Sequence, residues 1–151
     1  MPTAVIENIV DINKPPAEVF DYASDHMREK EWNPAMRYVR KLTDGPVGLG
    51  TRYEMEFVPG QPMVATCDGF DRPKSWNVSG RALGMDVTLG GEVIGTPTGS
   101  HLTIRTSFSS RGIRALALPF IRRRMSPPMQ RNVERIKAIL ESAALQPLSH
   151  G

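Results

Sequence analysis

The change of hydrophobic period at Gly112 most constrains what this chain can fold into. Before Gly112, apolar and polar residues alternate, as in residues 52–57, where Tyr53, Met55 and Phe57 are separated by charged residues. Such alternation is typical of a strand with one buried face. After Gly112, apolar residues recur every three to five positions, as on one face of an amphipathic helix. The order predicts an α+β chain in which a run of strands is followed by a long C-terminal helix.

Two short helices are predicted between the first and second strands. The alternation over residues 4–13 indicates a strand, and Pro15 or Pro16 can open a helix because the first helical position needs no backbone donor. Asp25 is a plausible N-cap for a second short helix. Pro34 should end that helix, because a residue before proline is disfavoured in the helical region.

The middle of the chain predicts an antiparallel meander, since short strand patterns follow one another with turn residues between them. Besides residues 52–57, strands are predicted over residues 36–43, 63–71, 75–82, 85–94 and 100–109. In the C-terminal helix, Ser126-Pro127-Pro128 predicts a kink or break, because proline removes a backbone donor and clashes with the preceding turn. Residues 127–144 should form the more regular half.

Composition suits one globular domain, predicted over residues 1–146, with a frayed tail over 147–151. The chain has 151 residues, 40% hydrophobic and 23% charged, which is ordinary for a soluble domain. Cys67 is the single cysteine, so an intrachain disulfide is impossible. We find no signal-peptide pattern and no apolar run near the roughly 20 residues that span a bilayer. These features predict a cytoplasmic protein, monomeric or homodimeric.

Positive charge is concentrated in the C-terminal segment. Residues 1–110 carry eleven Lys/Arg against fourteen Asp/Glu, whereas residues 111–151 carry eight against two. A basic residue near an anionic membrane contributes about 1 kcal/mol, so peripheral membrane contact through Arg122, Arg123 and Arg124 is one prediction. A solvated helix face is the alternative. Nucleic acid is not a predicted partner, because no recognised binding motif accompanies the charge.

Several local patterns resemble those of the START-related helix-grip superfamily (SRPBCC), and within it the polyketide cyclase/dehydrase-like and lipid-transport-like group. The resemblance rests on Ile12 with Pro15 to Phe20, Ser24-Asp25, Trp32-Asn33-Pro34, Gly48 to Tyr53, Phe70 to Pro73, and Asn132 to Lys137 with Glu141. It covers nearly the whole chain. These residues are turns, caps and core positions, so the pattern is more specific for a fold than for a function.

The resemblance implies a helix-grip fold, in which a seven-stranded antiparallel sheet curves around the C-terminal helix and encloses a largely apolar cavity. Family members bind lipids, sterols, hormones or polyketide-like aromatics, and some catalyse cyclisation or dehydration. The function expected here is therefore binding or carrying of a hydrophobic small molecule. The alternative is a cofactor-independent cyclase or dehydratase that acts in the same cavity.

The predicted ligand-binding wall follows from alternation on the strands and the apolar face of the helix, and it includes Trp32 because the resemblance implies an aromatic residue near the pocket mouth. Its residues are Trp32, Tyr53, Met55, Phe57, Trp76, Met85, Val87, Leu89, Ile104, Thr106, Phe108, Leu116, Phe120 and Met129. The small strand residues Gly80, Ala82, Gly90 and Gly91 predict that space is left beside this wall. An ordinary filled core is the alternative for each wall residue, and Trp32 can equally be a plug between helix and sheet.

Catalytic candidates are few: Tyr53, Asp68 and His26. A general acid or base should lie in a cleft. The register of residues 63–70 leaves the direction of Asp68 open, and His26, at a helix start, is expected to be exposed. No cofactor and no metal are predicted, because the three histidines lack ligand spacing and Cys67 has no partner cysteine.

Overall fold

The sheet contains seven strands in the order β1-β7-β6-β5-β4-β3-β2, and every neighbouring pair is antiparallel. The computed structural model describes residues 1–58 and 60–145, with side chains described as far as residue 142. The predicted tail, residues 147–151, lies outside this part. The strands are β1 (Thr3–Ile12), β2 (Met36–Lys41), β3 (Arg52–Phe57), β4 (Met63–Asp71), β5 (Ser75–Ala82), β6 (Met85–Thr96) and β7 (Gly99–Ser109).

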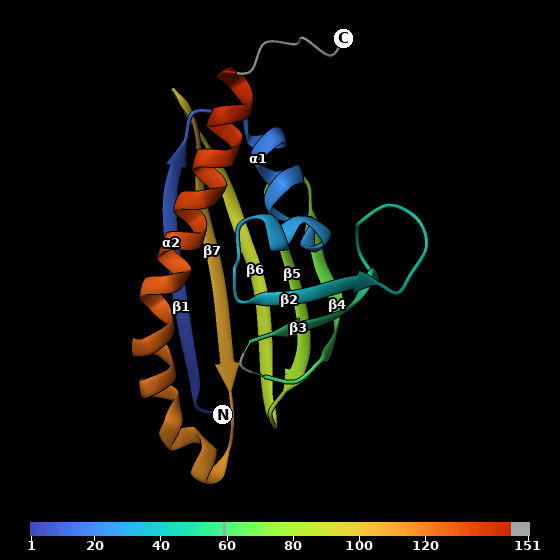
Figure 1. Ribbon diagram of the computed structural model, residues 1–151, viewed down its shortest axis with the longest axis vertical. Helices are drawn as coiled ribbons and strands as arrows, with labels where there is room; N and C mark the ends of the chain where they lie inside the picture. Colours follow the sequence, from blue (N-terminus) through green and yellow to red (C-terminus); the bar gives the residue numbers. More distant parts are fainter. Residues whose placement is uncertain (59, 146–151) are drawn as a thin grey trace.

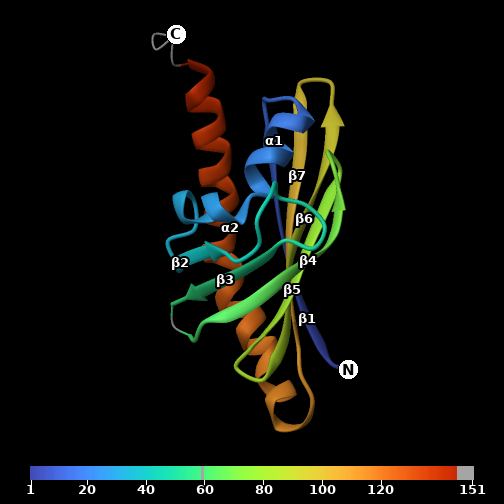
Figure 2. The same ribbon diagram turned by 90° about the vertical axis from the view of Figure 1, so that its right-hand side faces the viewer.

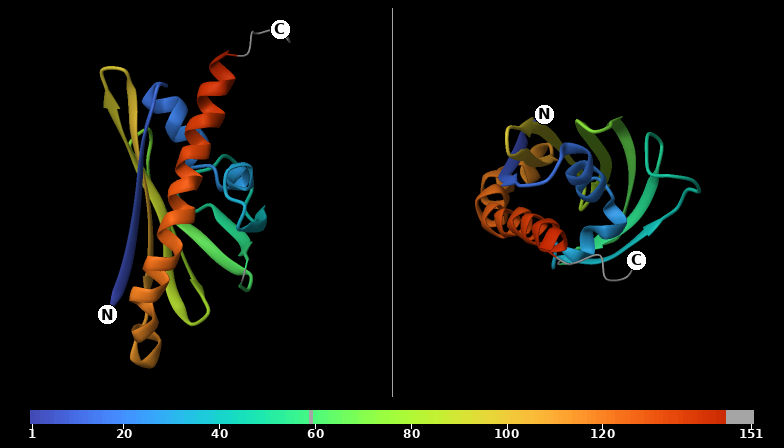
Figure 3. Two further views of the ribbon diagram at one scale, coloured as in Figure 1. Left: turned by 60° about the vertical axis from the view of Figure 1, so that its left-hand side comes forward. Right: turned by 90° about the horizontal axis from the view of Figure 1, so that it is seen from above.

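The sheet curves, and the helices lie on its concave side (Figures 1 and 3). The helices are α1 (Pro16–Ala23), the 3-10 helices η1 (His26–Glu31) and η2 (Gly112–Ala117), and α2 (Leu118–Leu145). The seven-stranded α+β helix-grip fold expected from the resemblance is therefore confirmed. The predicted cap is present too, because the Asp25 side chain accepts from the Met27 backbone N–H at 3.0 Å.

The α2 helix runs through Pro127 and Pro128 without a break, curving gently along β1 (Figure 1). Of the kink or break predicted there, the break is wrong, because the helix is continuous from Leu118 to Leu145. Each proline removes the donor for the carbonyl four residues earlier, and these carbonyls belong to Arg123 and Arg124, which are exposed. Water can satisfy exposed carbonyls, so the helix tolerates the pair. The change of helix type lies earlier, where η2 ends and α2 begins at Leu118.

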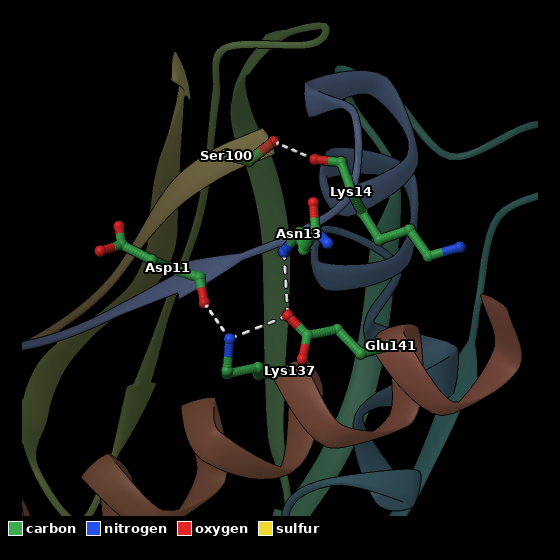
Figure 4. A network of polar contacts seen from close by, with 6 residues as sticks. All are labelled: Asp11, Asn13, Lys14, Ser100, Lys137 and Glu141. Carbon is green, nitrogen blue, oxygen red and sulfur yellow. Dashed lines mark hydrogen bonds and ion pairs between the residues drawn. The ribbon is translucent and has the colours of Figure 1, made fainter. Parts of the chain in front are cut away.

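Polar contacts hold the C-terminal half of α2 to the connection between β1 and α1 (Figure 4). Lys137 Nζ donates to the Asp11 carbonyl at 2.7 Å and lies 2.8 Å from a Glu141 oxygen. The same Glu141 oxygen accepts from the Asn13 backbone N–H at 2.9 Å, and Ser100 Oγ donates to the Lys14 carbonyl at 2.7 Å. We call this end of the molecule the closed end.

An aromatic cluster fills the concave side beneath α1. The Phe20 ring stands edge-on to Phe70 and Trp76, with centroids 5.3 and 5.5 Å apart. Val133 and Ile136 from α2 are both fully buried at 0% exposure. Edge-to-face aromatic pairs contribute beyond their buried area, so this cluster helps to fix α1 against the sheet.

Candidate functional site

The concave face of the sheet carries the predicted wall in continuous cross-strand rows. Thr106 on β7 lies opposite Leu89 on β6, which lies opposite Val78 on β5. A parallel row runs from Ile104 through Gly91 to Trp76. Because opposite residues in an antiparallel sheet point to the same face, these strands present one apolar surface.

The wall residues differ in burial. Six of those predicted are buried: Trp32, Tyr53, Met55, Trp76, Val87 and Thr106. Six are half-buried: Phe57, Met85, Leu89, Ile104, Phe108 and Met129. Of these, Met85 begins β6 and Phe108 lies near the end of β7, at the end of the sheet that leads into η2. We call the half-buried set with Thr106 the inner wall.

At two of the glycines that were expected to leave space beside the wall, neighbouring side chains fill the position. A Cβ on Gly91 would lie 2.5 Å from Cη2 of Trp76, so the indole ring occupies that position. A Cβ on Gly80 would lie 2.9 Å from the Met63 methyl and closer still to the β4 backbone. Gly90 pairs with Asn77 and Arg105, away from the wall. The prediction from small side chains is wrong at these positions, because small residues also permit close packing.

Four buried polar atoms have no hydrogen-bond partner among the described residues: His26 Nε2, Trp32 Nε1, Tyr53 Oη and Trp76 Nε1. All four belong to side chains on the concave side of the fold. Leaving a buried donor or acceptor unpaired costs about 1–3 kcal/mol. Such groups are rare in folded proteins. Four of them together lower the stability of the fold at this face.

His26 is buried, at 4% exposure, which corrects the expectation that it is exposed. Its Nδ1 lies 2.8 Å from Glu29 Oε1, and Asn33 Nδ2 donates to Glu29 Oε2 at 2.8 Å. All three side chains are buried because η1 packs against β2. If the neutral ring carries its proton on Nδ1 and donates it to Glu29, Nε2 is an acceptor, which is the arrangement found in many general bases.

Tyr53 stands beside His26. Their ring centroids are 5.4 Å apart in an edge-on arrangement, and Tyr53 is completely buried. Burial raises the pKa of the Tyr53 hydroxyl, and the nearby Asp25 and Cys67 raise it further. The hydroxyl therefore stays protonated across the physiological range, and it can donate a hydrogen bond to a carbonyl or an oxyanion.

Asp68 lies on the convex side of the sheet, so the structure does not bring it together with Tyr53 and His26. Its carboxylate accepts from Asn77 Nδ2 and Ser79 Oγ, both at 2.7 Å. Burial acts to raise the pKa of Asp68, but the hydrogen bonds from Ser79 and Asn77 outweigh it, and the pKa falls below its ordinary value. A solvent-facing, ionised carboxylate has no access to the inner wall.

Leu116 and Phe120 lie outside the inner wall, at 79% and 62% exposure. The helical period predicts that they share the inward face with Met129. Residues 112–117 instead form the 3-10 helix η2, whose different number of residues per turn changes the direction of each side chain. These two residues therefore belong to the exposed surface at the start of α2.

Glu29 and Asn33 were not predicted as site residues. A signal for Glu29 was present, since His26 and Glu29 are three residues apart and such pairs are neighbours on a helix. The hydrogen bonds around Glu29 also require the Asn33 side chain to reach back from the turn before Pro34. No local sequence pattern specifies that contact.

Two shallow hollows open on the surface. One, of about 340 Å³, lies where β1 meets α2 and is lined by Thr3, Val5, Ile6, Glu7, Arg122 and Ser126. The other, of about 310 Å³, is lined largely by residues of β5, β6 and β7, including Asn77, Gly90 and Arg105. The predicted wall contributes only Trp76 to these two hollows.

In the described residues, no three His, Cys, Asp or Glu side chains are grouped as a metal site would require. Across residues 1–58 and 60–145, no helix is long and apolar enough to cross a membrane.

A model of the family described as "Polyketide cyclase / dehydrase and lipid transport" matches residues 3–141. The di-domain ARO/CYC protein StfQ of the steffimycin biosynthetic pathway superposes with a TM-score of 0.74 at 15% identity, over 95% of this chain and 52% of StfQ. No curated protein sequence matches the chain at a significant level.

Two further structures show the same fold over nearly their full length. A point mutant of the norcoclaurine synthase from Thalictrum, in complex with a transition-state analogue, gives a TM-score of 0.70 at 18% identity, covering 94% of this chain and 96% of the synthase. Ara h 8.0201 gives 0.70 at 16% identity, covering 93% and 99%. At 15–18% identity, these likenesses show a shared fold alone.

Proposed function

We propose that this chain, which belongs to the polyketide cyclase/dehydrase and lipid transport family, binds one hydrophobic small molecule between the inner wall and α2. The ligand is mainly apolar and carries a carbonyl or hydroxyl group. Lipids, aromatic compounds and polyketide-like molecules have this chemistry, and the family description names polyketides and lipids.

The observation that carries the proposal is the coincidence of unpaired polar atoms with a half-buried apolar surface. Leu89, Ile104 and Phe108 are only half-buried although they face the concave side. Tyr53 Oη and His26 Nε2 are buried without partners in the described residues. Ligand sites combine such an apolar lining with a few placed polar groups. Because Tyr53 is fully enclosed, we expect the ligand's polar end to reach it by displacing neighbouring side chains.

Binding is tested with 1-anilinonaphthalene-8-sulfonate, an apolar fluorescent probe, after native mass spectrometry of the purified protein. Ile104→Trp places a large side chain on the inner wall and should weaken probe binding about tenfold or more, because the apolar contact area is lost. Ile94→Trp is the matched control, since Ile94 is 53% exposed on β6, away from the wall. Equal binding by both variants and the native protein refutes the site.

The second candidate function is proton transfer on a bound ketone, and the His26–Glu29 contact favours it. His26 Nε2 would take a proton from the carbon between two carbonyls of a poly-β-ketone, while Glu29 orients the ring. The resulting enolate carbon would form a bond to a second carbonyl, whose oxygen takes up the proton. Tyr53 would donate to the developing oxyanion. Loss of water from that alcohol would complete a dehydrative cyclisation.

His26→Gln tests this candidate, with turnover of a poly-β-ketone mimic as the readout. Loss of a positioned general base lowers such a rate by about 10²–10⁴-fold. His101→Gln is the matched control, because His101 makes a similar contact to Asp11 at 2.7 Å but lies at a strand start away from Tyr53. Unchanged turnover in His26→Gln refutes the catalytic role, and probe binding in the same variant remains a separate measure of the ligand site.

A further inference from the structure

Four exposed apolar side chains gather at the end of the molecule opposite the closed end. Ile113, Leu116 and Phe120 project from η2 and the start of α2, at 83%, 79% and 62% exposure. Leu83, at 53%, lies in the turn between β5 and β6. Figures 1 and 2 show η2 and this turn at the same end. We call these four residues the apolar tip.

Contact between the two segments is direct. A Cβ on Gly84 would lie 2.9 Å from the guanidinium carbon of Arg114, so the Arg114 side chain lies over the turn that carries Leu83. The tip is therefore one surface formed by segments about thirty positions apart in the chain. Exposed large apolar residues that cluster in this way mark interaction sites more often than singly scattered ones.

Arginines border the apolar tip. Five are exposed on η2, its flank and the first turns of α2: Arg111, Arg114, Arg122, Arg123 and Arg124. We call them the tip arginines. None of them forms an ion pair with another described residue. The sequence has no Asp or Glu between Glu92 and Glu134, so no acidic residue lies next to the tip arginines in the chain. The nearest acid on the hairpin, Asp86, lies 3.3 Å from Arg81.

Leu83 adopts an unfavourable backbone conformation. Ala82 pairs with Met85, so Leu83 and Gly84 form a two-residue turn with φ angles of 55° and 76°. Such turns favour Asn-Gly or Asp-Gly, because positive φ strains a larger side chain. Leucine gains little there from burial, since it is 53% exposed. An apolar side chain kept at a strained and exposed position suggests that it contacts something outside the protein.

We propose that the apolar tip and the tip arginines dock this protein on the surface of an anionic lipid bilayer. Leu83, Ile113, Leu116 and Phe120 enter the interfacial region, and the arginines contact lipid phosphates around them. An apolar face beside a cationic one is the combination that peripheral membrane segments use. The charge complementarity selects anionic over neutral lipid.

Other occupants fit this surface less well. A second copy docking through the same surface would bring two sets of five arginines together, because a two-fold interface presents the same patch to itself. A nucleic acid would pair with the arginines but would leave the four apolar side chains in water. An anionic bilayer would both pair with the arginines and remove the four apolar side chains from water.

The docking end is also where the inner wall approaches the surface. Met85 begins β6 beside the Leu83–Gly84 turn, and Phe108 lies near the end of β7, just before η2. Both are half-buried on the concave side. A bilayer at the apolar tip would therefore face the near end of the ligand site. This link between docking and ligand rests on the proposed function. Docking itself is independent of the ligand.

Vesicle co-sedimentation of the full chain tests the proposal, with vesicles of phosphatidylcholine alone and of phosphatidylcholine mixed with phosphatidylserine. We expect binding to the mixed vesicles only, weakened by added salt. Replacing Arg122 and Arg123 with alanine should weaken it about tenfold or more, since each basic residue contributes about fivefold. Leu116→Asp with Phe120→Asp should abolish it. Both pairs are exposed, so folding should be retained.

Leu83→Asn separates docking from folding. Asparagine suits the turn, so the variant should unfold at a higher temperature than the native protein while binding the mixed vesicles more weakly. Ile94→Asp and Arg37→Ala are the matched controls at exposed positions elsewhere. The proposal is overturned if the protein does not bind the mixed vesicles, or if it binds neutral vesicles equally well. It is also overturned if the tip variants bind like the native protein, or if the protein selectively binds DNA or an acidic protein instead. Its failure would leave probe binding by the inner wall unaffected, so the two proposals fail separately.

Discussion

Replacing Tyr53 with phenylalanine should stabilise the protein and weaken ligand binding. Tyr53 Oη is buried and has no hydrogen-bond partner among the described residues, while the ring itself is completely enclosed. Tyr53→Phe keeps the ring and its apolar contacts and removes only the unpaired hydroxyl. Opposite signs for stability and binding are expected of a group retained for a ligand.

The magnitude follows from the cost of burying an unpaired hydroxyl, about 1–3 kcal/mol in proteins. Taking the lower part of this range, because a small void replaces the oxygen, we expect the free energy of unfolding to rise by about 1 kcal/mol. In a chain of this size, such a change raises Tm by about 2–4 °C. Binding of a ligand with a carbonyl or hydroxyl group should weaken about fivefold to tenfold, since one hydrogen bond contributes about 1 kcal/mol.

Tyr22→Phe is the matched control, because the Tyr22 hydroxyl donates to Glu31 at 2.8 Å. Removing that hydroxyl loses a hydrogen bond to a charged acceptor and should lower stability by about 1–2 kcal/mol. Urea and thermal unfolding of the two variants beside the native protein give the comparison. A destabilised Tyr53→Phe, similar to Tyr22→Phe, would show that the Tyr53 hydroxyl is already paired within the fold and would refute the reasoning.

Two further substitutions test the packing and the closed end. Gly91→Ala should destabilise the protein by about 1–3 kcal/mol and alter tryptophan fluorescence, because its Cβ would lie 2.5 Å from the Trp76 ring; native stability would show that the ring moves freely. Hydrogen bonding from Lys137 lowers the pKa of Glu141 below its ordinary value of 4.5, so the stabilisation is present above that value and is lost as pH falls through the lowered pKa. In urea unfolding, Glu141→Gln should therefore differ from the native protein most at neutral pH, and a difference that grows in acid would contradict this sign.

Most elements were predictable from the sequence because their signals are local. The bounds of β4 and β5 agree with the predicted strands at both ends, and Asp25 caps η1 as expected. Alternation and capping depend on neighbours in the chain. Of the kink or break predicted at Pro127 and Pro128, the break is absent. Tolerance of proline depends on whether the residues four positions earlier are exposed, and that is a property of the packed helix.

The candidate site was predictable only in part. Alternation placed Tyr53 and Met55 on the buried face, where the structure has them. It could not show that Trp76 fills the space above Gly91, because that contact joins different strands. The exposed position of Phe120 likewise depends on the turn from η2 into α2, and the burial of His26 depends on η1 packing against β2.

By itself, the sequence determined the order of strands and helices, the apolar face of each strand and the basic character of the C-terminal segment. These follow from periods of two and 3.6 residues and from formal charge, which need no knowledge of distant neighbours. Only the tertiary structure decided that His26, Glu29 and Tyr53 meet on the concave side, and that Leu83 joins Ile113 in one exposed surface. The physical reason is that burial, unpaired polar atoms and surface patches arise where segments far apart in the chain pack together.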